Sequence, residues 1–337
     1  MKKRVAVNGL GRIGNQVLRH YIHNLPAECE IVAANTSSVE DAAYLLKYDS
    51  VHGRADFEIE TFGNEKLVID GHEIAIVSSH NPLELPWKEM GIDIVLECTG
   101  HFTERSAAAR HIEAGAKKVV ISAPGKNVDK TFVMGVNEKE YDDAKHHVVS
   151  NASCTTNSLA PVMKVLEESF GVQNAMITTT HAYTSSQSTV DKRAKKRRRG
   201  RAAAVNIIPT TTGAATATVE VIPSLEGKME AMALRVPVPD GAITEVVALL
   251  KSDVTVESVN EAFKRASEGE LKGILEYSTE EIVSTDIIGN RHSSIVDAPS
   301  TSVVGGRMVK VMAWYDNEYG YSQRLLELAD HIAKNMR

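Results

Sequence analysis

The sequence contains few cysteines and no arrangement of them that would form a structural site. Only Cys29, Cys98 and Cys154 are present among 337 residues, and no two of them have CxxC spacing. This pattern offers neither a disulfide framework nor a zinc site. His146 and His147 are adjacent but lack partner ligands at suitable spacing, so no metal site is expected. Reduced thiols predict a cytoplasmic protein, in which a cysteine can act as a catalyst.

Long apolar stretches are also absent. No segment approaches the ~20 consecutive apolar residues that a membrane-spanning helix requires. Residues 1–7 enter a strand pattern at once, so we expect no signal peptide. A net charge of −6 argues against a general nucleic-acid-binding protein. The composition, 24% charged and 43% hydrophobic, is typical of a globular protein, and the length suggests two domains.

A glycine-rich turn stands between two predicted strands near the start of the chain. Residues 4–8 form a buried strand pattern, Gly9-Leu-Gly11-Arg-Ile-Gly14 follows, and a helical pattern then leads to an apolar run at 31–34. This order of elements is the dinucleotide-binding fingerprint. The glycines allow a tight turn and a close approach of the backbone to a pyrophosphate, which rests on the helix N-terminus.

Further apolar runs extend the same pattern. Residues 92–97 and 118–122 read as strands, and a helical segment around 106–114 separates them. Alternating strands and helices of this kind predict a Rossmann-type, doubly wound parallel sheet in an α/β protein.

The position that normally distinguishes NAD from NADP departs from the NAD pattern. An acidic residue about 20 residues beyond the glycines usually accepts hydrogen bonds from the ribose hydroxyls and repels a 2′-phosphate. This chain has Asn35-Thr36-Ser37-Ser38 instead. The loop can be an ordinary polar turn after a strand. Alternatively, its hydroxyls can donate to a phosphate, and we therefore predict that NADP is accepted and preferred, with NAD as the other cofactor.

Cys154 lies in the run Ser150-Asn-Ala-Ser-Cys-Thr-Thr-Asn157, directly before an apolar helical pattern. Amide groups at a helix start stabilise negative charge, which predicts a thiol pKa lowered toward neutrality and a nucleophilic role. The alternative is an inert core thiol. A second candidate is His181, at the end of the β-rich run 176–180, where it can be the base of a Cys–His pair.

Two segments of the second half offer groups that bind anions. Thr210-Thr-Thr-Gly213 presents hydroxyls and amides, and Arg235 places a guanidinium at a strand end. Together they suggest a phosphorylated substrate.

With these motifs in place, the chain resembles phosphorylating glyceraldehyde-3-phosphate dehydrogenases over essentially its whole length. The matching segments are NGLGRIG, LLKYDSVHG at Leu45 to Gly53, SNASCTTN, THAYT, RAAAVNIIPTTTGAA from Arg201, LRVPVPDG, and WYDNEYGYS at Trp314 to Ser322. The resemblance implies a homotetramer. It also implies a dinucleotide-binding domain at 1–150 and 317–337, completed by the C-terminal helix, and an α+β catalytic domain with a mixed sheet at 151–316, including an S-shaped loop at 182–208.

The same resemblance implies the reaction and the residues that carry it. Cys154 attacks the aldehyde of glyceraldehyde 3-phosphate and His181 takes the proton; hydride transfer leaves a thioester that inorganic phosphate cleaves to 1,3-bisphosphoglycerate. The direction, toward glycolysis or toward gluconeogenesis, stays open. The implied substrate-binding residues are Ser153, Thr155, Thr184, Arg199, Thr212, Gly213 and Arg235. The implied cofactor-binding residues, together with those of the fingerprint and the specificity loop, are Gly9, Gly11, Arg12, Ile13, Gly14, Asn35, Thr36, Ser37, His80, Ser122, Asn317 and Tyr321.

The run 191–201 is unusual because eight of its eleven residues are basic. It lies in the S-shaped loop, which in the family packs at subunit contacts beside the cofactor. Three interpretations stay open: contacts with cofactor and subunits, a plain solvated face, or a nucleic-acid patch. The first is favoured, and nucleic-acid binding is the least favoured of the three.

The closest rival activity is that of an erythrose-4-phosphate dehydrogenase, which shares the thiol, the histidine and the fold. Thr184 and the TTTG segment favour the triose enzyme, because they supply the second anion site that phosphorolysis needs. Aspartate-semialdehyde dehydrogenase shares the thioester chemistry, but the motifs around Cys154 and Asn317 argue against it. A binding module that uses the basic run on RNA would not need Cys154.

Overall fold

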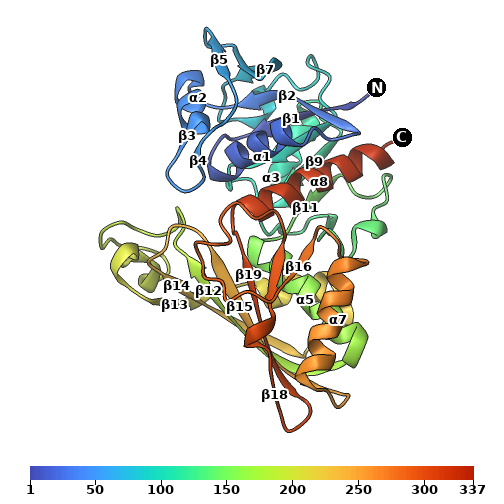
Figure 1. The fold of residues 1–337 in the computed structure, drawn as a ribbon. Coiled ribbons are helices and arrows are strands. Elements are labelled where there is room, and N and C mark those ends of the chain that lie inside the picture. Colours follow the sequence, from blue (N-terminus) through green and yellow to red (C-terminus); the bar gives the residue numbers. More distant parts are fainter. The chain divides into compact units, whose positions relative to one another are not determined.

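The computed structural model describes residues 1–337, and its contacts divide the chain into two compact units. Unit 1 comprises residues 1–153 and 322–337, and unit 2 comprises residues 154–321. Figure 1 shows the elements of both units coloured along the sequence. None of the helices combines the length and the hydropathy that a membrane-spanning segment requires.

Unit 1 is built on a nine-stranded sheet in the order β10-β11-β9-β8-β1-β2-β7-β6-β5. The pairs from β10 to β7 are parallel, and β6 and β5 add an antiparallel edge. The strands are β1 (Lys3–Asn8), β2 (Cys29–Asn35), β5 (Ile59–Phe62), β6 (Lys66–Ile69), β7 (His72–Val77), β8 (Ile94–Glu97), β9 (Lys118–Ile121), β10 (Lys130–Thr131) and β11 (Val148–Ser150).

Side chains that alternate along β1 pack into two different apolar layers. Val5 and Val7 contribute to the layer that contains Leu18 and Leu328, whereas Ala6 contributes to the opposite layer with Trp87. A strand buried on both faces in this way is characteristic of parallel sheets covered by helices. The helices of unit 1 are α1 (Arg12–His23), α2 (Val39–Lys47), α3 (Arg105–Ala108), α4 (Arg110–Glu113) and most of α8 (Tyr319–Asn335); β3 (Tyr48–Asp49) and β4 (Gly53–Arg54) form a separate short pair.

The predicted doubly wound sheet is confirmed, including its strands at 4–8, 31–34, 92–97 and 118–122. The helical segment predicted around 106–114 consists of two single turns, α3 and α4, that meet at Ala109. β1 has β2 on one side and β8 on the other, so the chain reverses its direction of winding at β1. In open α/β sheets, ligands bind at the carboxyl ends of the strands at such a switch point.

Unit 2 contains a mixed sheet of eight strands, in the order β13-β14-β12-β15-β19-β17-β16 with β18 paired to β19. This confirms the predicted mixed sheet. The strands are β12 (Val172–Ala182), β13 (Ile208–Thr211), β14 (Met229–Val236), β15 (Ala242–Leu250), β16 (Leu275–Ser278), β17 (Ser294–Asp297), β18 (Ser302–Val304) and β19 (Met308–Tyr315). The helices of this unit are α5 (Cys154–Phe170), α6 (Ala214–Val221) and α7 (Val256–Glu268).

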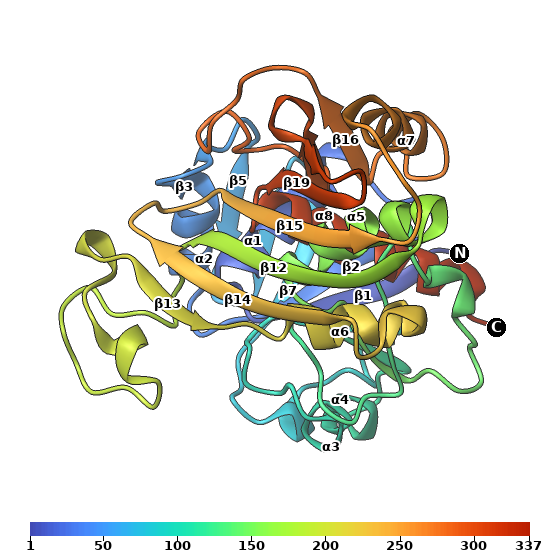
Figure 2. The same ribbon diagram turned by 90° about the horizontal axis from the view of Figure 1, so that it is seen from below.

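One face of the mixed sheet is covered and the other is open. Leu159 and Leu166 of α5 and Phe263 of α7 pack with Ile177 of β12 and Val246 of β15 in the core of unit 2. Figure 2 shows the opposite face of β14, β12 and β15, over which no helix lies. Contacts of Cys154 with His181 and of Thr155 with Tyr315 bring the ends of β12 and β19 to the N-terminus of α5, and Arg235 of β14 lies beside His181.

Candidate active site and cofactor pocket

Cys154 is the first residue of α5, as the sequence predicted. The residue two positions before it, Ala152, has a φ of 55°, which is uncommon for a residue with a side chain. Its amide donates a hydrogen bond to Ser150 Oγ, which holds this turn. Backbone strain of this kind is concentrated at functional sites, where the surrounding structure enforces it. Ser153, between them, is the last residue of unit 1.

Cys154 and His181 form a pair. The sulfur of Cys154 lies 3.4 Å from His181 Nε2, although 27 positions separate the two residues in the sequence. His181 is the penultimate residue of β12, and its Nδ1 lies 2.7 Å from the carbonyl oxygen of Ala182. Because a carbonyl oxygen can only accept, we assign the proton to Nδ1. Nε2 then faces the thiol as a hydrogen-bond acceptor, which is the arrangement a general base requires.

The environment favours the uncharged forms of both groups. Burial raises the pKa of the Cys154 thiol, and the Arg235 guanidinium and the hydroxyl and amide of Thr155 act in the opposite direction. Burial also lowers the pKa of His181 to about 3, and the positive charge of Arg235 adds to this effect. The predicted lowering of the thiol pKa is therefore contradicted, because burial outweighs the positive groups around the sulfur.

Tyr315 is a buried residue of this site that sequence reasoning did not single out. Its hydroxyl lies 3.0 Å from Thr155 Oγ1 and 2.9 Å from Thr179 Oγ1, and its ring meets the His181 ring edge to face. Thr155, expected at the phosphate-binding site, thus directs its hydroxyl toward Tyr315. The signal for Tyr315 was its place in the WYDNEYGYS segment, but only the pairing of β19 with β15 brings it to Thr155 and His181.

The residues expected to bind the substrate phosphate occupy neighbouring positions in unit 2. Arg235 Nη1 donates to the Ala182 carbonyl oxygen and lies 2.9 Å from His181 Nδ1, while its Nε is buried without a partner. Thr184 Oγ1 lies 2.9 Å from Ser186 Oγ, which also accepts from Arg199. Two guanidinium groups and two hydroxyls suit a dianionic phosphate.

The second expected anion site lies where β13 leads into α6. Arg199 Nε donates to Thr210 Oγ1, and Thr212 Oγ1 accepts from the amide of Ala214. Gly213 is the N-cap residue of α6 and has no side chain to cap it, so the amides that follow Ala214 in the first turn stay available. Thr210 belongs to the segment that the sequence predicted to bind anions, whereas the hydroxyl of Ser186, which accepts from Arg199, was not singled out.

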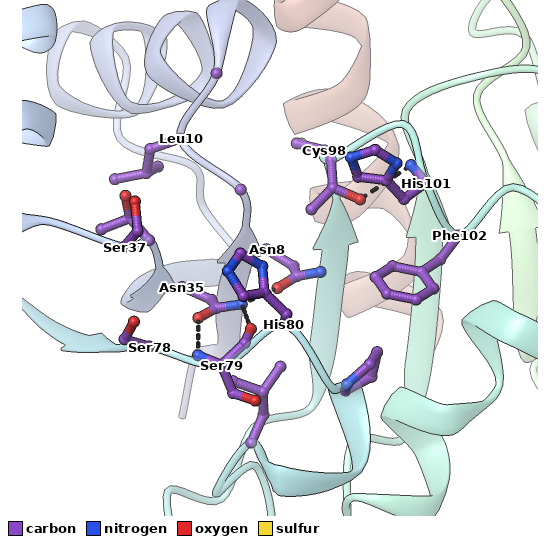
Figure 3. A pocket seen from close by; sticks show the side chains of 16 residues that line it. Asn8, Leu10, Asn35, Ser37, Ser78, Ser79, His80, Cys98, His101 and Phe102 are labelled. Atoms are coloured by element: carbon purple, nitrogen blue, oxygen red, sulfur yellow. Dashed lines mark hydrogen bonds between the residues drawn. The ribbon is translucent and has the colours of Figure 1, made fainter.

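The pocket of unit 1 lies at the carboxyl ends of the strands around β1. It has a volume of about 450 Å³ and collects Gly9, Gly11, Asn35, Thr36, Ser37 and His80 of the predicted cofactor residues. Asn8, Ser78, Ser79, Thr99 and Phe102 line it as well. Figure 3 shows Asn35 bonded to the backbone of Ser79, with Ser37, Ser78 and His80 around it. No carboxylate lines this pocket.

The glycine turn fits a dinucleotide. Gly9 has a φ of 99°, and a Cβ on Gly14 would lie 2.1 Å from the Gly9 carbonyl oxygen, so both positions require glycine. A Cβ on Gly11 would meet no protein atom within 4 Å, which leaves room there for a ligand. Helix α1 starts at Arg12, directly behind the turn, and no side chain caps it. These are the features that let a pyrophosphate rest on a helix N-terminus.

Four predicted cofactor residues of unit 1 lie outside the lining of this pocket: Arg12, Ile13, Gly14 and Ser122. The Arg12 guanidinium bonds both carboxylate oxygens of Asp49, at 2.6 and 3.2 Å. Ser122 directly follows β9, and its amide donates to the Glu97 carbonyl oxygen. Ile13 packs on the core of unit 1. Arg12 is therefore already neutralised by a carboxylate, which a sequence cannot reveal.

Asn317 and Tyr321, the remaining cofactor candidates, lie in unit 2 and are buried. Asn317 Oδ1 has no hydrogen-bond partner within the protein, which fits a side chain that receives an amide from a ligand. The preceding Asp316 accepts backbone hydrogen bonds from Gly289, Glu318 and Tyr319 and so holds the start of α8.

A doubly wound sheet with a glycine turn at its switch point, together with a thiol–imidazole pair, defines a dinucleotide-binding oxidoreductase. Comparison with known proteins gives the family. Residues 3–105 match the NAD binding domain of glyceraldehyde 3-phosphate dehydrogenase, and residues 153–317 match its C-terminal domain. The chain belongs to the glyceraldehyde 3-phosphate dehydrogenase family.

Relatives match over nearly the whole chain. A glyceraldehyde-3-phosphate dehydrogenase of Geobacillus stearothermophilus is 54% identical over 334 residues, which cover 99% of each chain. Glyceraldehyde-3-phosphate dehydrogenase 2 of Bacillus subtilis is 51% identical over 338 residues, covering 100% of this chain and 98% of the relative. Glyceraldehyde-3-phosphate dehydrogenase 1 of the same organism is 52% identical over 335 residues, covering 99% of both.

Proposed function

We propose that the protein oxidises glyceraldehyde 3-phosphate, with inorganic phosphate, to 1,3-bisphosphoglycerate through a thioester on Cys154. The observation that carries this proposal is the 3.4 Å contact between Cys154 Sγ and His181 Nε2. The guanidinium groups of Arg235 and Arg199 lie in the same unit and supply positive charge for the phosphates. Unit 1 acts as the dinucleotide-binding domain and unit 2 as the catalytic domain.

The first step forms a carbon–sulfur bond. The Cys154 sulfur attacks the aldehyde carbon while its proton passes to His181 Nε2, and protonation of the aldehyde oxygen gives a hemithioacetal. Because burial favours the uncharged thiol and the uncharged imidazole, the proton moves as the bond forms. The Cys154 amide at the start of α5 would stabilise the developing negative charge on oxygen.

The second step is the oxidation. His181 Nε2 takes the hydroxyl proton of the hemithioacetal as the hydride leaves carbon, and a thioester remains on Cys154. When bound, the nicotinamide ring accepts this hydride. Asn317, with its unpartnered Oδ1, is the residue that would orient the carboxamide of the ring.

The third step breaks the thioester. An oxygen of inorganic phosphate attacks the acyl carbon, the carbon–sulfur bond breaks, and Cys154 leaves as a thiolate. The attacking phosphate would lie near Thr212, Gly213 and the start of α6, where amides and hydroxyls are available. The substrate phosphate would lie near Thr184, Arg199 and Arg235.

The cofactor is proposed to be NADP or NAD, with NADP preferred. The pocket carries Thr36 and Ser37 at its specificity position, is also lined by Ser78 and Ser79, and contains no carboxylate that would repel a 2′-phosphate. His80 lines the same pocket and offers a nitrogen donor. The Arg12 guanidinium bonds the carboxylate of Asp49.

We further propose a homotetramer. The open face of the unit 2 sheet carries Met176, which is 70% exposed, and Met232, which is 43% exposed, on adjacent strands. Apolar residues gathered on an uncovered sheet face are typical of an interface between subunits. Sedimentation of the purified protein tests this proposal.

One experiment tests the reaction. Reduction of NADP and of NAD is followed with glyceraldehyde 3-phosphate and with erythrose 4-phosphate, each with and without inorganic phosphate. We expect cofactor reduction that depends on the triose and on phosphate, and loss of turnover in Cys154→Ser. Faster turnover of erythrose 4-phosphate, or full turnover of Cys154→Ser, would contradict the proposal.

A further inference from the structure

A fully buried carboxylate lies next to the cofactor pocket and is not used by the proposed reaction. Glu97 is the last residue of β8, and it is 1% exposed. It is paired in the sheet with Asn8, the last residue of β1, which lines the pocket. A charge removed from water in this way is costly unless hydrogen-bond donors surround it. The donors around Glu97 therefore indicate its role.

Uncharged donors occupy both oxygens of this carboxylate. Glu97 Oε2 accepts from Asn8 Nδ2 and lies 3.1 Å from His111 Nε2. Glu97 Oε1 accepts from the hydroxyl of Thr99 and, at 2.9 Å, from the Thr99 amide. An ionised carboxylate offers about four acceptor positions and no donor. The four contacts therefore fill the capacity of an ionised side chain.

One line of donors reaches Glu97 from the pocket. The backbone amide of Ser79 donates to Asn35 Oδ1, so Asn35 Nδ2 is the group that donates to Asn8 Oδ1, at 2.7 Å. Asn8 Nδ2 is then left to donate to Glu97. Figure 3 shows Asn8 and Asn35 side by side at the pocket. Because a backbone amide can only donate, each side-chain amide along this line has a single orientation.

A second line of donors reaches Glu97 from the interior of unit 1. The indole Nε1 of Trp87 donates to His111 Nδ1 at 3.0 Å, and both side chains are fully buried. An indole nitrogen can only donate, so we assign the proton of His111 to Nε2, which faces Glu97. Both lines of donors thus end on the same carboxylate. Neither a carboxylic acid nor a neutral amide could accept from all of them.

We propose that Glu97 is a positioning residue for the dinucleotide, because its charge fixes the orientation of side chains that line the cofactor pocket. Through Asn8 it orients Asn35, whose backbone carbonyl oxygen accepts from the Gly9 amide. Through its two bonds to Thr99 it holds the residue that packs against the glycine turn, since Thr99 Cγ2 would lie 2.8 Å from a Cβ on Gly9. This role rests on the proposed binding of NADP or NAD in the pocket.

Glu97→Gln tests the charge of this side chain at nearly constant size. Either orientation of the new amide sets its NH₂ group against an N–H donor, of Thr99 on one side or of Asn8 on the other. The matched control is Asp93→Asn. Asp93 directly precedes β8, at the other end of the same strand, is 8% exposed, and accepts from the Arg4 amide and from Lys117. Both variants remove a buried carboxylate, but only Glu97 is bonded to residues of the pocket.

The test is calorimetric titration of the full-length, nucleotide-free protein with NADP, with NAD and with ADP-ribose. We expect the three dissociation constants of Glu97→Gln to rise at least about tenfold, as the loss of one hydrogen bond to a charged group implies. Asp93→Asn should also lower the unfolding midpoint but change the dissociation constants by less than about threefold, because it lies at the far end of the strand.

A second pair of variants keeps the role testable if Glu97→Gln does not fold. His111→Gln and His111→Met introduce side chains of similar length, and His111 does not line the pocket. Only glutamine offers an N–H group to Glu97 and an oxygen to Trp87. We expect ADP-ribose to bind at least about threefold more tightly to His111→Gln than to His111→Met.

The outcomes separate this role from the proposed function. Unchanged nucleotide affinity in Glu97→Gln, or an equal loss in Asp93→Asn, would overturn the positioning role. Equal affinities of His111→Gln and His111→Met would overturn it as well. Nucleotide binding that follows these expectations, without cofactor reduction that depends on the triose and on phosphate, would reject the proposed function alone.

Discussion

The absence of a carboxylate from the cofactor pocket leads to a prediction about cofactor choice. Thr36 follows the last residue of β2, its amide donates to the Val77 carbonyl oxygen, and the residue lines the pocket. Replacement by aspartate places a negative charge there without removing the backbone hydrogen bond. Thr36→Asn is the matched control, because asparagine has nearly the shape of aspartate but no charge.

The expected loss can be worked out from Coulomb's law. A phosphomonoester carries roughly two negative charges at neutral pH. A carboxylate about 5 Å away repels two charges by about 1.7 kcal/mol at the dielectric constant of water, and by several kcal/mol at the lower effective value near a protein surface. The smaller figure already corresponds to roughly a 17-fold loss. NAD has no 2′-phosphate, and its ribose hydroxyls can donate to the new carboxylate.

The assay is the initial rate of cofactor reduction at saturating triose phosphate and inorganic phosphate, measured against NADP and NAD concentration. We expect kcat/KM for NADP to be higher than for NAD in the parent protein. In Thr36→Asp it should fall at least about tenfold for NADP and stay level or rise for NAD. Thr36→Asn should change the ratio of the two values by less than about threefold.

Two results would refute this reasoning. A strong preference of the parent for NAD would show that the hydroxyls of the loop do not receive a 2′-phosphate. An equal loss of kcat/KM for both cofactors in Thr36→Asp would show that the loss comes from a disturbed pocket structure and not from repulsion by the new charge. High salt should reduce the discrimination by Thr36→Asp, because exposed charges are screened.

Four other substitutions test separate parts of the structure. Cys154→Ser should lower the rate of cofactor reduction by roughly 10³-fold or more without changing cofactor affinity, and unchanged turnover would exclude the thioester. Gly14→Ala should lower the unfolding midpoint, because its Cβ would lie 2.1 Å from a carbonyl oxygen, whereas Gly11→Ala should keep the midpoint and weaken cofactor binding in a fluorescence titration. Burial, together with Asp316, raises the pKa of Asp240 from 3.8 to about 9, so the native state binds this proton more tightly and stability falls as pH rises between these values. Asp240→Asn should therefore raise the free energy of unfolding by roughly 1 to 4 kcal/mol at pH 8 but leave it unchanged below about pH 4, and an equal effect at both pH values would contradict the pKa assignment.

Much of the architecture could be predicted from local patterns in the sequence. The turn from Gly9 to Gly14 is specified by residues that follow one another in the chain, because the backbone conformation it needs is one that only glycine adopts easily. The start of α5 at Cys154 could also be predicted, because an apolar helical repeat follows a run of small polar residues there. The division of one predicted helical segment into α3 and α4 could not be predicted, because nothing in the residue pattern indicates a break at Ala109.

The candidate site could be predicted only in part from the sequence. Cys154 and His181 could be named, but their 3.4 Å contact depends on where β12 ends relative to α5. Tyr315 lies in a segment that the sequence analysis quoted, but no role was assigned to it. Only strand pairing brings its hydroxyl to Thr155. The ion pair between Arg12 and Asp49 joins residues 37 positions apart, so only the fold shows that the guanidinium of this cofactor-binding candidate already has a carboxylate partner.

The sequence by itself determined the glycine turn, the position of the thiol at a helix start and the charges of the loop at 191–201, since each of these is a property of neighbouring residues. Only the tertiary structure decided the electrostatics of the thiol and the imidazole. A helix start predicts a lowered thiol pKa, but the pKa of Cys154 is raised and that of His181 is lowered to about 3. The reason is that burial and the placement of Arg235 arise from packed strands distant in sequence, and desolvation outweighs the local field of one helix.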